Sequence, residues 1–92
     1  MSDKTQTVST SILLRTGAGQ LMAVAISSSS GSPIATFYDN TAGSGTKVFE
    51  AYVPTGYPLL HNFGEILAPF FSTGLYLSLA AGMTATIWWR EF

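Results

Sequence analysis

The chain has 92 residues, of which 47% are hydrophobic and 10% are charged, with no cysteine and a net charge of −1. This length fits one domain, and the lack of cysteine excludes disulfides and cysteine-ligated zinc as sources of stability. A near-zero net charge argues against nucleic-acid binding, which needs a basic footprint. No stretch approaches the roughly 20 apolar residues of a membrane helix, and residues 1–7 lack the apolar run of a signal peptide, so we expect a protein that is not secreted.

The low charge suggests that the chain works in an assembly. A domain of this size buries only about 60–65% of its unfolded surface, so its own core is marginal. Its charged fraction is 10%, against about 25% in ordinary soluble domains. Ser, Thr and Gly can supply a polar surface, but we favour the alternative that neighbouring subunits cover much of it. We therefore expect a homo-oligomer.

The hydrophobic pattern has a period of two, which is typical of strands. We expect seven, at residues 7–16, 20–28, 34–38, 47–53, 65–68, 75–80 and 83–90. The segment 20–28 is apolar on both faces, which fits a central strand and leaves a helix as the alternative. Seven short strands at regular spacing predict an all-β fold, a single small β-sandwich or jelly-roll-like domain of antiparallel strands over residues 10–92.

Residues 1–9 are expected to lie outside that domain. They are polar, and the strand period begins only near Val8. Such a segment buries too little apolar area to order itself. We expect an N-terminal arm that orders when it pairs with a neighbouring subunit.

Two apolar features suggest a protein interface. The loop 54–64 is too apolar for a solvated loop, so it is either a contact surface or folded back on the core. Trp88 and Trp89 are adjacent on a predicted strand and therefore point to opposite faces. One enters the core, and the other is an anchor for a protein partner, a stacking platform for a sugar, or a side chain covered by its neighbours. The candidate interface residues are Tyr57, Leu59, Leu60, Phe63, Trp88 and Trp89.

No catalytic or metal-binding constellation is evident. His61 is the only histidine, and a triad with Asp39 lacks the nucleophile-elbow motif around any serine. The five acidic residues show no marked pair of the kind that a glycosidase needs. The segment 39–46 lacks the Gly-Lys-Ser/Thr order of a phosphate loop and has too few carboxylates for calcium, so we interpret it as a hairpin turn. We expect no enzyme activity, no catalytic residues, no metal and no cofactor.

Three segments resemble small virion proteins of tailed bacteriophages. The first, 36–47, is a strand that ends in Tyr-Asp-Asn-Thr, followed by a small-residue turn and by Ser-Gly-Thr-Lys at the start of the next strand. The second, 71–79, contains the Gly-Leu-Tyr that opens a late strand. The third, 84–89, looks like the closing strand. The resemblance covers residues 34–89 and rests on turn and strand motifs.

The resemblance implies a non-enzymatic β-sandwich protein made in the host cytoplasm and located in the virion, as a capsid decoration or cement subunit. It implies two partners: copies of the chain itself, with a trimer expected on a capsid, and the major capsid protein or another virion protein. The apolar loop 54–64 and the pair Trp88 and Trp89 depart from the pattern, which leaves a neck or tail-associated virion protein as an alternative. Trp88 near Arg90 also leaves open a second class, a carbohydrate-binding β-sandwich module.

Overall fold

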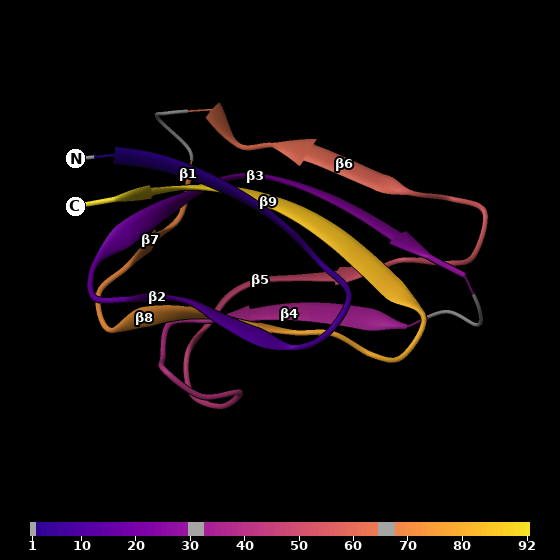
Figure 1. The fold of residues 1–92 in the computed structure, drawn as a ribbon, viewed down its shortest axis with the longest axis horizontal. Helices are drawn as coiled ribbons and strands as arrows, with labels where there is room; N and C mark the ends of the chain where they lie inside the picture. Colours follow the sequence, from indigo (N-terminus) through magenta and orange to yellow (C-terminus); the bar gives the residue numbers. More distant parts are fainter. Residues whose placement is uncertain (1, 30–32, 65–67) are drawn as a thin grey trace.

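The protein folds into two antiparallel sheets packed face to face (Figure 1). The computed structural model describes residues 2–29, 33–64 and 68–92. The larger sheet contains, in order, β1 (Ser2–Val8), β9 (Met83–Glu91), β3 (Gly19–Ser28) and β6 (Leu59–Asn62), and β7 (Phe70–Phe71) also pairs with β3. The smaller sheet contains, in order, β2 (Ile12–Thr16), β8 (Gly74–Ser78), β4 (Ile34–Tyr38) and β5 (Lys47–Tyr52). The predicted all-β sandwich is confirmed, with nine strands in the described residues in place of seven.

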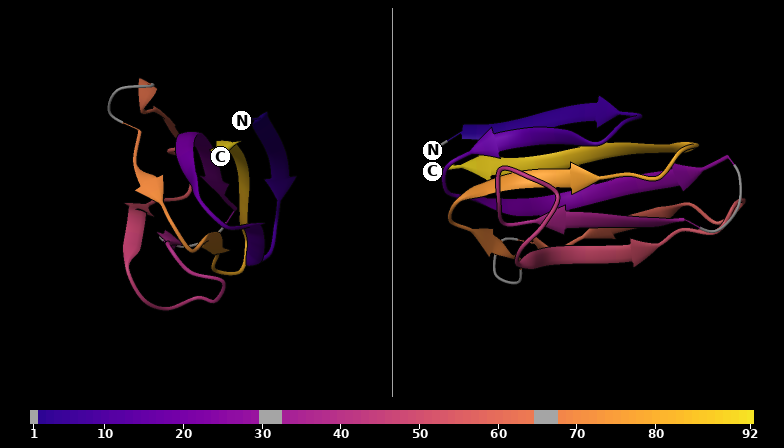
Figure 2. Two further views of the ribbon diagram at one scale, coloured as in Figure 1. Left: turned by 90° about the vertical axis from the view of Figure 1, so that its left-hand side faces the viewer. Right: turned by 90° about the horizontal axis from the view of Figure 1, so that it is seen from below.

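The strand pairing is that of one long folded ribbon. β1 pairs with β9, β2 with β8, β3 with β6, and β4 with β5. The turn at 39–46 is the tip of this ribbon. The ribbon wraps on itself so that β3 also meets β9 and β4 also meets β8. This connectivity is that of a jelly roll, and it places the two termini side by side at one end of the sandwich (Figures 1 and 2).

The core lies between the sheets and consists of inward-facing residues from both. On β9 the alternation holds as predicted, since Met83, Ala85, Ile87 and Trp89 are all buried. Phe37 and Leu77, which are directly opposite each other in the smaller sheet, are fully buried against them. The largest fully buried side chains are Phe37, Leu21, Ile26, Leu75, Leu77, Met83, Ile87, Val24 and Val53.

A β-bulge in β3 interrupts the simple alternation of inward and outward side chains along this strand. Simple alternation would place Leu21 on the same face of the sheet as Ala23 and Ala25. The register against β9 instead shifts between Leu21 and Ala23, so one extra residue, Met22, lies between them. Leu21 therefore joins Val24 in the core, and Ala23 and Ala25 face outward.

The N-terminal segment differs from the predicted arm. Ser2–Val8 is the edge strand β1, paired with β9 along its whole length. Its described side chains are exposed except for the half-buried Val8. Backbone hydrogen bonds and cross-strand polar pairs therefore hold it: Thr7 and Thr86 share a hydroxyl hydrogen bond of 2.8 Å, and Arg90 Nε donates to Asp3 Oδ1 at 2.8 Å. An apolar pattern cannot reveal a strand of this kind.

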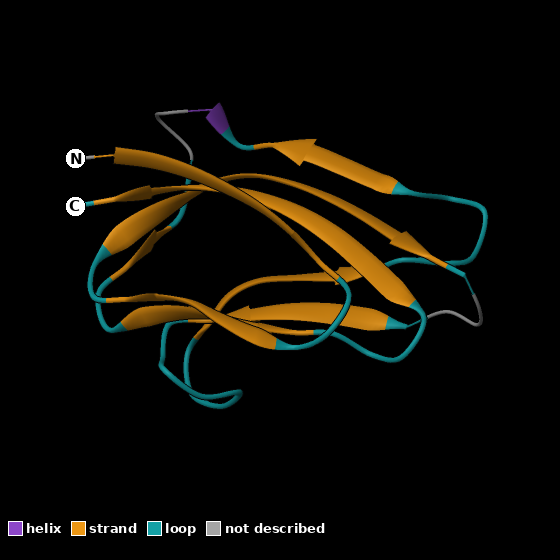
Figure 3. Cartoon of the chain, viewed as in Figure 1, coloured by secondary structure: helices purple, strands orange, loops and turns teal. Residues whose placement is uncertain are grey.

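Three other predicted boundaries change. The predicted strand 7–16 covers the end of β1 and the whole of β2, which are separate strands (Figure 3) and lie in different sheets. The predicted loop 54–64 contains β6, which pairs with β3. The predicted strand 65–68 falls on residues 65–67, which lie outside the described part of the chain, and β7 follows after Pro69.

One carboxylate joins the tip of the ribbon to the turn before β8. Asp39 Oδ1 accepts hydrogen bonds from the backbone N–H groups of Ser72 (3.0 Å), Thr73 (2.8 Å) and Gly74 (3.4 Å). Asp39 Oδ2 accepts one from the Ser72 hydroxyl at 3.2 Å. Partial burial opposes ionisation of Asp39, but these donors outweigh it and lower the pKa of the carboxyl below its usual value. The predicted turn at 39–46 is therefore also a joint between distant segments.

Deleting residues 1–7 tests the assignment of β1 to the domain itself. The deletion removes all of β1 except Val8 and leaves one edge of β9 unpaired. Each lost backbone hydrogen bond costs about 1 kcal/mol net, so we expect the melting temperature of the isolated protein to fall by at least several degrees. The substitution Lys4→Ala, which keeps the backbone ladder, is the matched control and should change it by little. An unchanged melting temperature for the deletion would return the segment to the role of an arm.

Candidate functional site

The structure divides the predicted interface residues into two groups. Trp89 is only 4% exposed and lies in the core. Leu59 and Phe63 are partly buried and pack against that core. The residues that remain on the surface are Tyr57, Leu60 and Trp88, with exposed fractions of 75%, 77% and 37%. The loop is therefore folded back on the core at Leu59 and Phe63, whereas Leu60 stays exposed because neighbouring residues on β6 face opposite ways.

The exposed members Leu60 and Trp88 border a groove on the outer face of the larger sheet. In one row of that sheet, Ala23 of β3 lies between Trp88 of β9 and Asn62 of β6. In the next row, Ala25 of β3 lies opposite Leu60 of β6. The surface is hollow along β3 because this middle strand carries small side chains and its neighbours carry larger ones.

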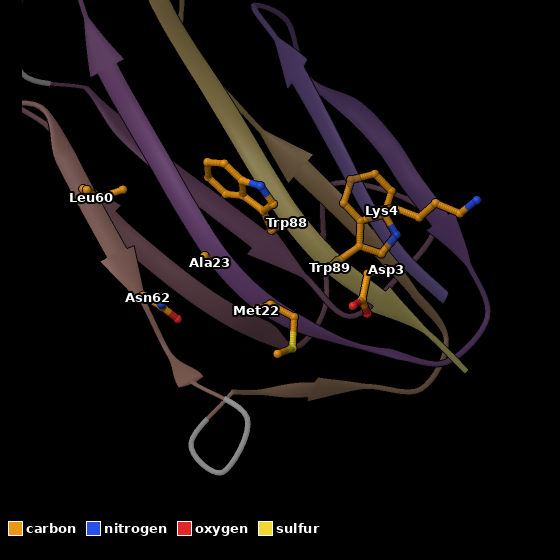
Figure 4. A pocket seen from close by; sticks show the side chains of 8 residues that line it. All are labelled: Asp3, Lys4, Met22, Ala23, Leu60, Asn62, Trp88 and Trp89. Carbon is orange, nitrogen blue, oxygen red and sulfur yellow. The ribbon is translucent and has the colours of Figure 1, made fainter. Parts of the chain in front are cut away.

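The hollow beside Trp88 has a volume of about 470 Å³. Figure 4 shows Leu60 and Trp88 pointing toward each other across β3. The residues that line it are Asp3, Lys4, Met22, Ala23, Leu60, Asn62, Trp88 and Trp89. A second hollow of about 410 Å³ continues along β3 toward Ser27, with Leu60 lining both. We call the first hollow the Trp88 groove.

The polar groups of the Trp88 groove are held in place by neighbours. Asp3 lies directly opposite Arg90 and accepts its Nε–H, and this guanidinium lowers the pKa of the Asp3 carboxyl. Asn62 Oδ1 accepts the N–H of Gly64 at 3.0 Å, which orients the amide. Lys4 lies opposite the buried Trp89, and its side chain points away from the groove (Figure 4). The charges of Asp3 and Arg90 at the rim of the groove therefore offset each other.

Most charged side chains of the described surface lie beside an opposite charge. The ion pairs are Asp3–Arg90 (2.8 Å), Arg15–Glu91 (3.4 Å) and Lys47–Glu50 (3.0 Å). Asp39 is occupied by the joint with 72–74. Exposed pairs of this kind add little stability. They do leave a surface with little free charge to keep copies of the protein apart.

The outer face of the smaller sheet is a second candidate surface, which the sequence reasoning missed. Leu13 and Tyr38 lie on either side of Tyr76, each directly opposite it. Farther along the same sheet, Ile34 is directly opposite Tyr52, and the two are 52% and 61% exposed. We call these five residues the tyrosine face. The alternation within 34–38 could have revealed it, since that pattern places Ile34 and Tyr38 on one side.

His61 has a packing role. It stacks on Phe49 with ring centroids 5.7 Å apart and meets Phe63 edge-on at 4.4 Å. Since Phe49 is on β5 and His61 on β6, this cluster closes one edge of the sandwich between the two sheets. The oxygens of Asp39 are directed to 72–74, so the structure does not support a triad of these two residues with a serine.

Within residues 2–29, 33–64 and 68–92, no group of three or more His, Asp or Glu side chains is placed to hold a metal ion. The same residues contain no helix of the length and apolarity needed to cross a membrane. Comparisons of the chain with protein-family models, with curated proteins and with solved structures find no significant match.

Serine substitutions at Leu59 and Leu60 test the assignment of the two faces of β6. Leu59→Ser removes an apolar side chain that packs on the core, and should lower the free energy of unfolding by about 1–3 kcal/mol. Leu60→Ser changes a side chain that is 77% exposed, and should change it by less than about 0.5 kcal/mol. Urea unfolding measures both. Equal losses would mean that Leu60 also belongs to the core.

Proposed function

We propose that the protein is a non-enzymatic structural subunit of a phage virion, of the capsid decoration or cement kind, which oligomerises and binds a protein shell. One observation carries the proposal: the described surface pairs most of its charges and presents large apolar and tyrosine side chains on its outer faces. A subunit that clamps a shell works through contact area and needs no reactive group. A position at the neck or tail is the alternative within the same proposal.

The tyrosine face is the part of the surface best suited to contact protein. Tyrosine is enriched at protein interfaces because it offers a large contact area and a hydroxyl at low cost in side-chain entropy. Within this face Glu50 lies opposite Thr36, between Tyr38 and Ile34, and its charge is paired with that of Lys47 at 3.0 Å. Glu50 also accepts the Thr36 hydroxyl at 2.8 Å. A neighbour can cover the face without burying an unpaired charge.

The fold and the motifs support the proposal more weakly. Jelly rolls occur in viral capsid proteins, and also in lectins and cupins, so the fold alone does not select among them. The motif segments that resemble phage virion proteins meet in the structure, where Asp39 of one binds Ser72, Thr73 and Gly74 of the other. Their residue types are therefore explained by folding, as expected for a family without a catalytic site.

Sedimentation at micromolar concentration tests the self-association that this proposal requires. We expect an oligomer, with a trimer if the protein decorates a capsid. The double substitution of Ile34→Ser and Tyr52→Ser should shift the protein toward the monomer without unfolding it. Phe70→Ser is the matched control, because Phe70 is a 64% exposed aromatic residue on the other sheet. A wild-type protein that stays monomeric and is missing from purified particles examined by electron cryo-microscopy would refute the proposal.

A further inference from the structure

We propose that the Trp88 groove is a binding subsite for a neutral sugar, which accepts one hexopyranose ring of a glycan. The inference goes beyond the proposed function, because it concerns the larger sheet, whereas the tyrosine face belongs to the smaller one. A shell-bound subunit with both surfaces would hold protein on one side and present the sugar site on the other.

Trp88 supplies the stacking platform. Its side chain is 37% exposed, and the residues directly opposite it on the two neighbouring strands, Ala23 and Thr5, are both small. The indole therefore keeps a face that neither neighbouring strand covers (Figure 4). A pyranose ring presents C–H groups on one face, and these pack on the negative face of an aromatic ring.

The groove has the width that one sugar ring needs. Asn62 and Trp88 lie on β6 and β9, on either side of Ala23, so their backbones are about 9–10 Å apart. The Ala23 methyl forms the floor, and Leu60 and Met22 contribute apolar walls. The volume of about 470 Å³ falls within the range of roughly 300–1,000 Å³ for small-molecule sites. A stable protein interface would instead need about 800 Å² from each partner.

The polar rim of the groove suits hydroxyl groups. The amide of Asn62 is oriented by its bond from Gly64 N–H, and an amide can both donate to and accept from a hydroxyl. Asp3 uses Oδ1 for Arg90, and a carboxylate has several lone pairs available for further donors. A few oriented polar groups around an apolar platform are the usual composition of a small-ligand site.

The charge balance of the groove favours a neutral ligand over an anionic one. Asp3 and Arg90 neutralise each other across 2.8 Å. Lys4 points away from the hollow (Figure 4). A phosphate or a carboxylate sugar would find no unbalanced positive charge here, and would lose hydration without compensation.

The test uses the full chain on a glycan array that carries neutral hexose and N-acetylhexosamine oligosaccharides together with their sialylated counterparts. We expect the protein to bind at least one of the neutral oligosaccharides on the array. Isothermal titration calorimetry with the corresponding free trisaccharide should then show that Trp88→Ala weakens binding by about tenfold or more, a loss of the size expected for a central contact. Trp88→Phe should retain part of the affinity, and Asn62→Ala should lose several-fold.

Phe92→Ala is the matched control, since Phe92 is a 50% exposed aromatic residue that lines neither hollow, and it should leave sugar affinity unchanged. Thermal melts of each variant confirm folding. The inference is overturned if no neutral glycan is retained, or if a retained glycan binds Trp88→Ala as well as the wild type. It is also overturned if Trp88→Ala abolishes self-association, because the groove would then be a protein contact. Sugar binding by a strict monomer would support this inference while contradicting the proposed function.

Discussion

The fold depends on the joint that Asp39 makes with the turn before β8. Burial of one face of each strand limits the registers that are possible, and wrapping of the ribbon brings β4 against β8 in one of them. The Asp39 carboxylate sets that register by accepting three backbone N–H groups from 72–74. Hydrogen bonds to an ionised group are roughly twice as strong as neutral ones. The joint therefore holds the turn 39–46, at the tip of the ribbon, in place on the smaller sheet.

Gly74 makes this joint possible at close range. A Cβ added there would lie 2.8 Å from the carbonyl oxygens of both Arg15 and Asn40, which are backbone atoms that cannot move aside easily. Any other residue would push β2 or the 39–46 turn away from β8. The segments 36–47 and 71–79 thus contain the residues that hold the wrapped ribbon together, and they also contribute Tyr38 and Tyr76 to the tyrosine face.

Much of the fold was predictable from the sequence, whereas the arrangement of the surface was not. Period-two alternation identified β9 well because its buried residues alternate from Met83 to Trp89, and it identified β4 although Thr36 is buried between Ala35 and Phe37. It missed β1, whose described side chains are mostly polar and which is held by its backbone. It could not anticipate the bulge at Met22, because a bulge is set by the pairing with β9 and β9 lies more than 50 residues away in the chain.

The same limits explain which candidate residues the sequence could identify. Adjacent tryptophans must point to opposite faces, so one core and one surface residue were foreseeable, but only the register shows that Trp89 is the buried one. The Trp88 groove exists because the bulge turns Ala23 and Ala25 outward between larger neighbours. The tyrosine face was missed because its members come from four separate strands.

The measurement that tests this account most directly is the pH dependence of stability in the variant Asp39→Asn. The folded pKa of Asp39 is lowered, so its contribution is present above the unfolded value near 3.8 and is lost as the pH falls through the folded value. Asp3 and Glu50 also have lowered pKa values, set by Arg90 and Lys47, and they act in both proteins. The difference between the two proteins therefore isolates Asp39.

We expect Asp39→Asn to lower the free energy of unfolding at pH 7 by about 1–2 kcal/mol, with the difference between the two proteins shrinking as the pH falls below 4. Amide hydrogen exchange at Ser72, Thr73 and Gly74 should be faster in the variant at pH 7. Equal stability of the two proteins at pH 7, with unchanged protection of these three amides, would contradict the claim that this carboxylate fixes the wrapped ribbon.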